Sequence, residues 1–478
     1  MIKWGVSFMI HDASLCVMKD TKILFASHAE RYSGIKNDAN LNEALINDAL
    51  KFGKPDAIYF YENPALKTLR RLYAGQGFKF SNPKKYFRDL GITAPVYWGN
   101  HHKSHAAAGF FTSPFNEAAI LTIDAIGEFD TTSIWHGDKK KGVFKKLSSE
   151  RYPKSLGLFY SAMTDRVGLK ANEDEYILMG MSGYGNADRF YYDVSELYKS
   201  SHNFHKGCKE FLPDLKEEDY FDLAAATQYV YENALKRLLE KTRKTTGQKN
   251  LVLMGGCAIN CLANRLASKY FDNTWIMPNP GDAGSSLGAI LAHTKKQAEW
   301  KGPYLGFNIK GKYPTNELFN ELKTTGIAGV ANGKAEFGPR ALGNRSLLAD
   351  PRGSQMKDVV NKIKKRQEFR PFAPVILQED VSEYFNVSHD FESPYMQYIV
   401  TCKKPEDFPA IVHIDGTSRV QTVTKDQHRG LYELLTLWKK HTGCPMLLNT
   451  SLNIKGKPIV NNKTDAKQFE KRYSVKVF

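Results

Sequence analysis

The chain has 478 residues, of which 42% are hydrophobic. Because a single hydrophobic core rarely serves a chain of this length, we expect two domains. Its apolar runs fall far short of the ~20 residues of a membrane-spanning helix, and its six cysteines do not form a disulfide framework. These features predict a reduced, cytoplasmic protein with no membrane partner. The formal net charge is +16, with 28 Lys and Arg against 18 Asp and Glu in residues 301–478. Such charge suits an anionic partner, although a lysine-rich solvated surface explains it without one.

The first 300 residues alternate between strand-like and helical patterns. Strands are predicted at 23–29, 56–62, 118–126 and 250–256, and a long helix at 221–243. This alternation is typical of the α/β class. Residues 301–314 contain three glycines and two prolines, which predicts a linker.

The remaining residues, 315–478, predict a second α/β domain. Helices are expected near 315–325, 354–366 and 428–441, and strands at 326–332, 417–423 and 445–449. In the middle helix one apolar face is predicted, formed by Met356, Val359, Val360 and Ile363.

Three histidines lie together in NHHKSHAAAGFF, residues 100–111. Asn100 is a candidate N-cap for a helix that continues through the alanines. His101 and His105 are then four residues apart and share one helix face, whereas His102 points elsewhere. Two imidazoles at this spacing suit one metal ion, although histidines satisfied by ordinary contacts are the commoner explanation.

A metal site requires further ligands, and two aspartates are well placed to supply them. Asp124 lies late in the predicted strand 118–126, and Asp282 lies in the turn NPGDAGSS before a helix rich in small residues. Two histidines with carboxylates, leaving coordination positions open, suit Fe(II) better than a structural zinc ion.

Three strand-to-turn stretches carry Gly or Asp where a nucleotide phosphate can approach, at 5–14, 122–132 and 254–266. Each stretch alone is a weak signal, but their order resembles the ASKHA fold of sugar kinases, actin and Hsp70-type ATPases. The candidate nucleotide-binding residues here are Gly127, Gly255, Gly256 and Asn260.

Arginine and lysine recur in two segments of the second block, 333–353 and 364–374. Arginine on Gly- and Pro-rich loops suits bidentate binding of a polyanion, and a loop stabilised by salt bridges is the alternative. The candidates are Arg340, Arg345, Arg352, Lys364, Arg366 and Arg370.

Taken together, these motifs closely resemble O-carbamoyltransferases of the nodulation and antibiotic-tailoring type. The matching stretches are HDAS, NHHKSHAA, LTIDAIGEFDTT, EYILMGMSGYG, GGCAINC, PGDAGSSLGA, GPRALGNRSLLADPR, EFRPFAP, DGTSRVQTV and GCPMLLNTSLNIKGKPIV. They cover most of the chain in the order of the family, and GPRALGNRS is the most specific of them.

The resemblance implies a Kae1-like ASKHA domain at 1–300 and a YrdC-like α/β domain at 315–478. The second domain would form carbamoyl-adenylate from ATP, carried by Mg²⁺, and carbamoyl phosphate. The first would transfer the carbamoyl group to an acceptor hydroxyl beside Fe(II), or another divalent metal, bound by the two histidines and two aspartates. His11 or Asp12 would activate the hydroxyl, and Arg419 and Asn449 join the candidate residues for ATP and carbamoyl phosphate.

Three departures from the family pattern stand out. Ile177 occupies a position where lysine is expected, Gln367 one where glutamate is expected, and the sequence after residue 470 is shorter than usual. None of them removes a candidate metal ligand or the arginine-rich loop.

The acceptor is the part of the reaction that the motifs specify least. Residues 68–87 interleave basic and aromatic side chains, which suits phosphate contact with base stacking, although a surface with a few buried aromatics explains them equally well. The first interpretation predicts a 5-hydroxymethylpyrimidine in DNA or a nucleotide as acceptor, and the second leaves a sugar or antibiotic hydroxyl. The competing functions are a tRNA threonylcarbamoyl transferase, a kinase and a non-catalytic nucleic-acid-binding protein, and a homodimer stays open.

Overall fold

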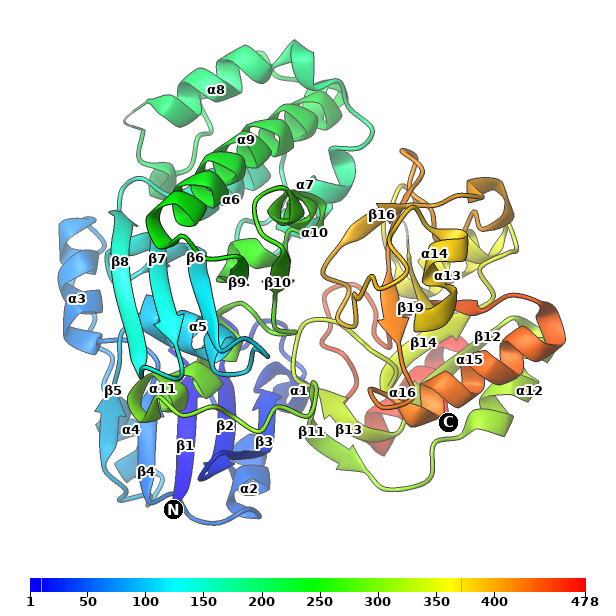
Figure 1. The fold of residues 1–478 in the computed structure, drawn as a ribbon, viewed down its shortest axis with the longest axis horizontal. Helices are drawn as coiled ribbons and strands as arrows, with labels where there is room; N and C mark the ends of the chain where they lie inside the picture. Colours follow the sequence, from blue (N-terminus) through cyan, green and yellow to red (C-terminus); the bar gives the residue numbers. More distant parts are fainter. Residues whose placement is uncertain (10, 201, 371) are drawn as a thin grey trace. The chain divides into compact units, whose positions relative to one another are not determined.

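The computed structural model describes residues 1–9, 11–200, 202–370 and 372–478 (Figure 1). The described chain divides into two compact units. The N-terminal unit comprises Met1–Ala29 and Asn37–Trp300, and the C-terminal unit comprises Glu30–Lys36 and Lys301–Phe478. Segment 30–36 belongs to the C-terminal unit against the sequence expectation; there, buried Arg31 donates a hydrogen bond to the carbonyl of Gly338 (3.0 Å).

The N-terminal unit contains two five-stranded sheets. The first has the order β3-β2-β1-β4-β5 and the second the order β8-β7-β6-β9-β10. Their strands are β1 (Ile2–Ser7), β2 (Ser14–Lys19), β3 (Lys22–His28), β4 (Ala57–Phe60), β5 (Val96–Trp98), β6 (Glu117–Gly127), β7 (Asp130–Asp138), β8 (Val143–Arg151), β9 (Asn250–Met254) and β10 (Asn273–Trp275).

The two sheets share one topology. In each sheet, three consecutive strands form an antiparallel meander. A later strand pairs in parallel with the first strand of that meander, and a further strand pairs in parallel with this later strand. This duplicated arrangement identifies the ASKHA-type fold that the motif order predicted. No repeat in the sequence indicates the duplication.

Helices cover and connect these sheets. They are α2 (Glu43–Leu50), α3 (Pro64–Tyr73), α4 (Pro83–Asp89), α5 (His101–Phe110), α6 (Leu156–Arg166), α7 (Glu175–Met181), α8 (Tyr191–Lys199), α9 (Tyr220–Thr246), α10 (Cys261–Asn264) and α11 (Ser285–Thr294). Helices α5 and α11 each follow the last strand of one sheet, and they pack against each other. At Gly288 of α11 an added Cβ would lie 1.9 Å from the carbonyl oxygen of Ser104 in α5, so glycine permits this close packing.

The C-terminal unit is built on a mixed sheet of order β12-β14-β19-β15-β18. Its strands are β11 (Tyr304–Ile309), β12 (Ile327–Ala331), β13 (Gly333–Glu336), β14 (Arg345–Ala349), β15 (Ala373–Leu377), β16 (Ile399–Thr401), β17 (Thr417–Arg419), β18 (Gln421–Val423) and β19 (Met446–Ser451). Its helices are α1 (Glu30–Ser33), α12 (Thr315–Thr325), α13 (Met356–Lys364), α14 (Val381–Tyr384), α15 (Arg429–Thr442) and α16 (Lys463–Tyr473).

Two sequence expectations for this unit need correction. Residues 304–309 lie within the predicted linker, but they form β11 and pair with β13, because backbone hydrogen bonding outweighs the flanking Gly and Pro. On α13, Val359 belongs to the predicted apolar face but is 42% exposed, whereas Val360 is fully buried.

Among the described residues, no helix is both long and apolar enough to cross a membrane.

Candidate active site

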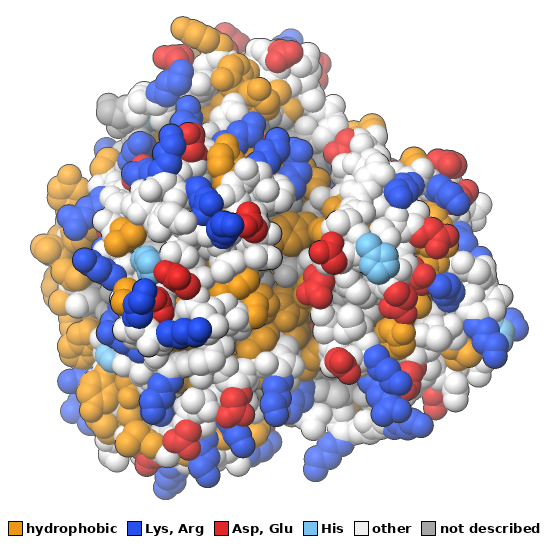
Figure 2. Space-filling model, viewed as in Figure 1, with side chains coloured by type: hydrophobic (Ala, Val, Ile, Leu, Met, Phe, Trp, Pro, Cys, Tyr) orange, Lys and Arg blue, Asp and Glu red, His pale blue; other side chains and the backbone are white. Residues whose placement is uncertain are grey.

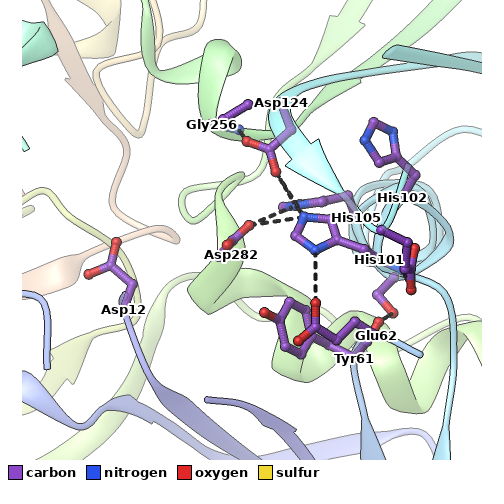
Figure 3. A network of polar contacts seen from close by, with 12 residues as sticks. Asp12, Tyr61, Glu62, His101, His102, His105, Asp124, Gly256 and Asp282 are labelled. Atoms are coloured by element: carbon purple, nitrogen blue, oxygen red, sulfur yellow. Dashed lines mark hydrogen bonds and ion pairs between the residues drawn. The ribbon is translucent and has the colours of Figure 1, made fainter. Parts of the chain in front are cut away.

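Two histidines and two aspartates meet inside the N-terminal unit (Figure 3). His101 and His105 come from the first turns of α5, Asp124 from the end of β6, and Asp282 from the short 3₁₀ turn before α11. The Nε2 atom of His101 lies 2.8 Å from Asp124 Oδ2 and 3.2 Å from Asp282 Oδ1. The Nε2 atom of His105 lies 3.2 Å and 3.1 Å from the same two oxygens. All four side chains are buried.

Local backbone features aim these side chains at one another. Asn100 caps α5, since its Oδ1 accepts a hydrogen bond from the amide of Lys103 (3.0 Å), and this cap fixes where the two histidines fall. The pairing of β6 with β7 is interrupted between Ile123 and Gly127, so Asp124 leaves the regular ladder. Irregularities of this kind often redirect a side chain beside an active site.

Outer contacts lie behind three of the four side chains. His105 Nδ1 donates to the carbonyl of Pro280 (3.0 Å), which turns Nε2 toward the cluster. His101 Nδ1 lies 3.9 Å from a carboxylate oxygen of Glu62. The amide of Gly256 donates to the outer oxygen of Asp124 (3.2 Å). Such outer partners are typical of metal-binding histidines and carboxylates.

The geometry of the cluster fits a divalent metal ion. Nitrogen and oxygen ligands lie about 2.1 Å from such an ion, so neighbouring ligand atoms at right angles are about 3 Å apart, close to the 2.8–3.2 Å observed. Burial raises the pKa of Asp124 and Asp282, but the adjacent imidazoles outweigh burial and hold both pKa values well below the usual range. Both carboxylates are therefore ionised and available to a cation.

The other two histidines near the cluster are placed differently. His102 is buried against Ser133, with Nδ1 2.9 Å from the hydroxyl oxygen, and burial lowers its pKa to about 3. His11 is 41% exposed, and its Nε2 lies 4.0 Å from the outer oxygen of Asp282. Burial lowers the His11 pKa, but the carboxylates of Asp12 and Asp282 overcome this effect and raise it to about 9. His11 and Asp12 thus form a pair at the accessible edge of the cluster.

Two of the four residues predicted to bind nucleotide contact this cluster directly. Gly127 lies directly against the His101 ring, and Gly255 has a φ of +93°, which favours glycine. Gly256 binds Asp124 through its amide, and Asn260 caps α10 through the amide of Ala263 (3.1 Å). These contacts explain Gly127 and Gly256 as supports of the cluster, and nucleotide binding by all four residues stays a prediction.

Gly127→Ala is expected to displace His101. A Cβ at this position would lie 2.4 Å from the imidazole ring, so the ring must move. Since loss of an outer-shell contact costs about 10–100-fold in metal affinity, we expect a loss of at least about 10-fold, measured by metal titration of the purified protein. Gly281→Ala is the control, because a Cβ there would meet nothing nearer than 3.8 Å. Equal metal affinity in both variants would contradict the assignment of His101.

In the C-terminal unit, three of the predicted anion-binding side chains come together. Lys364 is buried, and burial together with the charges of Arg366 and Arg370 lowers its pKa well below the usual range. Its Nζ contacts neutral oxygens, the carbonyl and hydroxyl of Ser451 and the Oδ1 of Asn453 (2.6 Å). Arg366 and Arg370 are half-buried, and a bound polyanion would stabilise the charged forms of all three side chains.

Arg345 is predicted from sequence to bind an anion, but in the structure its contacts are with the backbone. Its side chain is fully buried, and its guanidinium donates to five backbone carbonyl groups. These belong to Phe307, Asn332, Gly333, Asn344 and Asn461. With its donors directed at the backbone, Arg345 joins strands and loops of the unit.

The remaining candidates of this unit have mixed surroundings. Arg352 is 40% exposed, pairs with Asp350 (2.7 Å) and lies over Trp438, so its contacts are those of a surface ion pair. Asn449 is buried and donates to the side chain of Gln421 (2.6 Å), while its own Oδ1 is buried without a hydrogen-bond partner.

The Nε of Arg419 is likewise buried without a hydrogen-bond partner, and Arg340 is half-buried.

Two residues depart from the family pattern. Ile177 is buried in α7, and Gln367 accepts a hydrogen bond from Arg370 (3.5 Å). Neither side chain carries a charge of its own.

Two carboxylates beside the cluster were not predicted from the sequence. Glu62 faces His101 and pairs with buried Lys67. Glu128 accepts hydrogen bonds from the amides of Asn63 (2.7 Å) and His101 (3.1 Å), and so holds the N-termini of α3 and α5 together. The available signal was position alone, since each glutamate lies just after the end of a strand.

The fold and the cluster define an ASKHA-type α/β protein with a candidate metal centre beside its paired helices. A family model described as the carbamoyltransferase N-terminus matches residues 84–291, and one described as the carbamoyltransferase C-terminus matches residues 319–478. Nodulation protein NolNO of Sinorhizobium fredii is 30% identical over 96% of this chain and 76% of that protein. The chain therefore belongs to the carbamoyltransferase family and is an enzyme, an O-carbamoyltransferase.

Two further similarities lie at lower identity. The 3'-hydroxymethylcephem-O-carbamoyltransferase of Amycolatopsis lactamdurans is 26% identical, over 95% of this chain and 94% of that protein. The crystal structure of full-length HypF with phosphate and nucleotide bound is 14% identical with a TM-score of 0.33, covering 62% of this chain and 46% of that chain.

Proposed function

We propose that this O-carbamoyltransferase works in two steps, one in each unit. In the C-terminal unit, carbamoyl phosphate is hydrolysed to carbamate and phosphate. A carbamate oxygen then bonds to the α-phosphorus of ATP, and pyrophosphate leaves. In the N-terminal unit, the acceptor hydroxyl oxygen bonds to the carbonyl carbon of the carbamoyl-adenylate, and AMP leaves. Adenylation supplies the good leaving group that carbamate itself lacks.

The cationic cluster of Lys364, Arg366 and Arg370 is the observation that carries the first step. These side chains are suited to neutralise the charge of the ATP phosphates, bound with Mg²⁺, and of carbamoyl phosphate. Arg340, Arg419 and Asn449 are proposed to complete this site, since the last two hold buried polar atoms without a partner.

The second step is proposed to take place at the His–Asp cluster. His101, His105, Asp124 and Asp282 would hold a divalent metal, for which we propose Fe(II) from the two-histidine and carboxylate donor set. When bound, such an ion acts as a Lewis acid toward phosphate or carbonyl oxygens. The carboxylate of Asp12, at the accessible edge beside His11, is suited to take the proton of the acceptor hydroxyl.

We propose a 5-hydroxymethylpyrimidine in DNA or in a nucleotide as the acceptor. The name of the Amycolatopsis relative specifies a hydroxymethyl group on a ring as its acceptor, which supports a primary alcohol of this kind. The basic and aromatic segment at 68–87 supports a nucleic-acid substrate. A sugar or antibiotic hydroxyl is the competing acceptor.

Product analysis tests the two-step reaction. With ATP and carbamoyl phosphate, we expect AMP, pyrophosphate and phosphate, whereas a kinase would give ADP. Arg370→Ala should lower AMP formation by about 100-fold or more, in line with the loss of one preorganised charge-stabilising donor. Arg429→Ala, which removes an exposed arginine paired with Glu433 in the same unit, is the matched control and should stay within about 2-fold of wild type.

Acceptor identity is tested by offering hydroxymethylcytosine-containing DNA, the free nucleotide and an aminoglycoside under identical conditions. We expect a carbamoyl mass increase on the pyrimidine substrates. Modification of the aminoglycoside alone would refute the proposed acceptor and leave the two-step reaction standing.

A further inference from the structure

Helix α3 exposes its apolar face and buries two of its basic side chains, the reverse of an ordinary surface helix. An amphipathic helix normally buries its apolar side, but here Lys67 and Arg70 are each 5% exposed. Its apolar side chains are exposed instead, namely Leu66 (42%), Leu69 (55%), Leu72 (48%) and Tyr73 (70%). An outward apolar face of this extent marks a binding surface.

The exposed face continues into the next segments of the chain. Exposed aromatic and basic side chains of residues 73–98 form what we name the aromatic–basic surface. Its members are Tyr73, Phe78, Lys79, Phe80, Lys84, Lys85, Arg88, Tyr97 and Trp98. Helix α3, helix α4 and edge strand β5 lie along one side of the N-terminal unit (Figure 1), where hydrophobic and basic side chains alternate on the face drawn in Figure 2.

A groove lies within this surface. Its volume is about 600 Å³, and Lys84, Arg88, Tyr97, Trp98 and His293 are among its lining residues. The Lys84 ammonium lies over the Trp98 ring, 4.9 Å from its centre. The volume falls within the ~300–1,000 Å³ of typical ligand sites, so the surface offers a hollow as well as exposed rings.

The surface also has one sign of charge. Of the seven Lys and Arg in residues 64–98, the exposed ones are Lys79, Lys84, Lys85 and Arg88, against a single acidic residue, Asp89. A second copy of this chain would bring two such surfaces into like-charge contact. A polyanion with flat apolar rings is complementary instead, because its phosphates meet the lysines and its bases stack on the exposed aromatics.

The surface is connected to the candidate active site. At the start of α3, the amide of Asn63 donates to Glu128, the same carboxylate that binds the amide of His101. At the other end of α3, Tyr73 packs near Phe129, the residue after Glu128, with ring centres 6.3 Å apart. Helix α3 is therefore held against the turn that supports the metal-binding histidine.

We propose that the aromatic–basic surface binds single-stranded DNA and so holds the acceptor strand on the unit that carries the His–Asp cluster. This inference rests on the proposed pyrimidine acceptor and names the polymer and the surface that receive it. A hydroxymethyl group stacked inside a duplex is inaccessible, so an unpaired strand is the form that delivers it.

Binding of unmodified DNA tests the surface independently of catalysis. A fluorescein-labelled single strand of about 20 nucleotides, longer than the site of a typical single-strand-binding fold, would be titrated with full-length protein in the absence of ATP and followed by anisotropy. We expect Phe78→Ala with Phe80→Ala to weaken binding by at least about 10-fold through lost stacking. Lys84→Gln with Lys85→Gln should lower the slope of log affinity against log salt by about 1.4.

The matched control is Lys19→Gln with Lys22→Gln. These exposed lysines lie at the turn between β2 and β3, on the opposite edge of the same sheet as β5, and should leave affinity unchanged. Equal loss in the control, no binding by wild type at about 50 mM salt, where phosphate contacts are strong, or tighter binding to anionic vesicles with the same sensitivities would overturn the inference.

The two proposals fail separately. Suppose that free hydroxymethyl nucleotide is carbamoylated by wild type and by both double variants of the surface, while DNA binding is absent. That result would overturn the surface and keep the acceptor. DNA binding at this surface without carbamoylation of any pyrimidine would support the surface and overturn the acceptor.

Discussion

His105→Ala is expected to remove the bound metal and to lower carbamoyl transfer by at least about 100-fold. The Nε2 of His105 lies about 3 Å from three other candidate ligand atoms, and Nδ1 is held by Pro280, so alanine removes an oriented ligand. Loss of an outer-shell contact alone costs about 10–100-fold, and loss of a ligand should cost more. Elemental analysis and titration with Fe²⁺ under anaerobic conditions measure the metal without reference to activity.

His102→Gln is the control for this variant. His102 lies on the same helix and is equally buried, but its ring contacts Ser133. We expect this variant to retain the metal and most of the transfer activity, provided that its melting temperature shows a folded protein. Full metal occupancy in His105→Ala, or equal loss in both variants, would refute the proposed ligand set.

The His–Asp cluster is largely predictable from sequence because each ligand obeys a local rule. Helical spacing places His101 and His105 on one face, and the N-cap Asn100 marks where that face begins. Asp124 follows a run of apolar residues that indicates a strand, and Asp282 precedes a helix of small residues. The motif order then indicates that these distant turns meet.

Local sequence patterns do not predict contacts that depend on the whole fold. A loop arginine such as Arg345 can face an anion or the backbone carbonyls of its own unit, and the sequence is the same in both cases. The outward orientation of the apolar face of α3 cannot be predicted from sequence for a similar reason. Its hydrophobic pattern predicts an apolar face but not whether other elements cover that face. The duplicated sheets share connectivity rather than side chains, so no sequence repeat reveals them.

Arg345→Ala is expected to destabilise the C-terminal unit by at least about 3 kcal/mol. The substitution removes the Arg345 donors from five backbone carbonyls, two in buried and three in half-buried residues, and each unsatisfied buried group costs about 1–3 kcal/mol, offset in part by entering water. Urea unfolding followed by the fluorescence of buried Trp438 measures this loss, and hydrogen exchange in β14 and β19 locates it. Arg352→Ala, which removes a partly exposed ion pair, should change stability by less than about 1 kcal/mol.

The two interpretations of Arg345 differ in what fails first. An arginine that binds an anion could be removed with little effect on folding, and AMP formation would be lost in a unit of normal stability. An arginine that joins strands and loops has no direct part in the chemistry, so activity should fall only as the unit unfolds and should recover at lower temperature. Normal unfolding and exchange with abolished AMP formation would therefore restore the phosphate-binding role that the sequence predicted and refute the structural one.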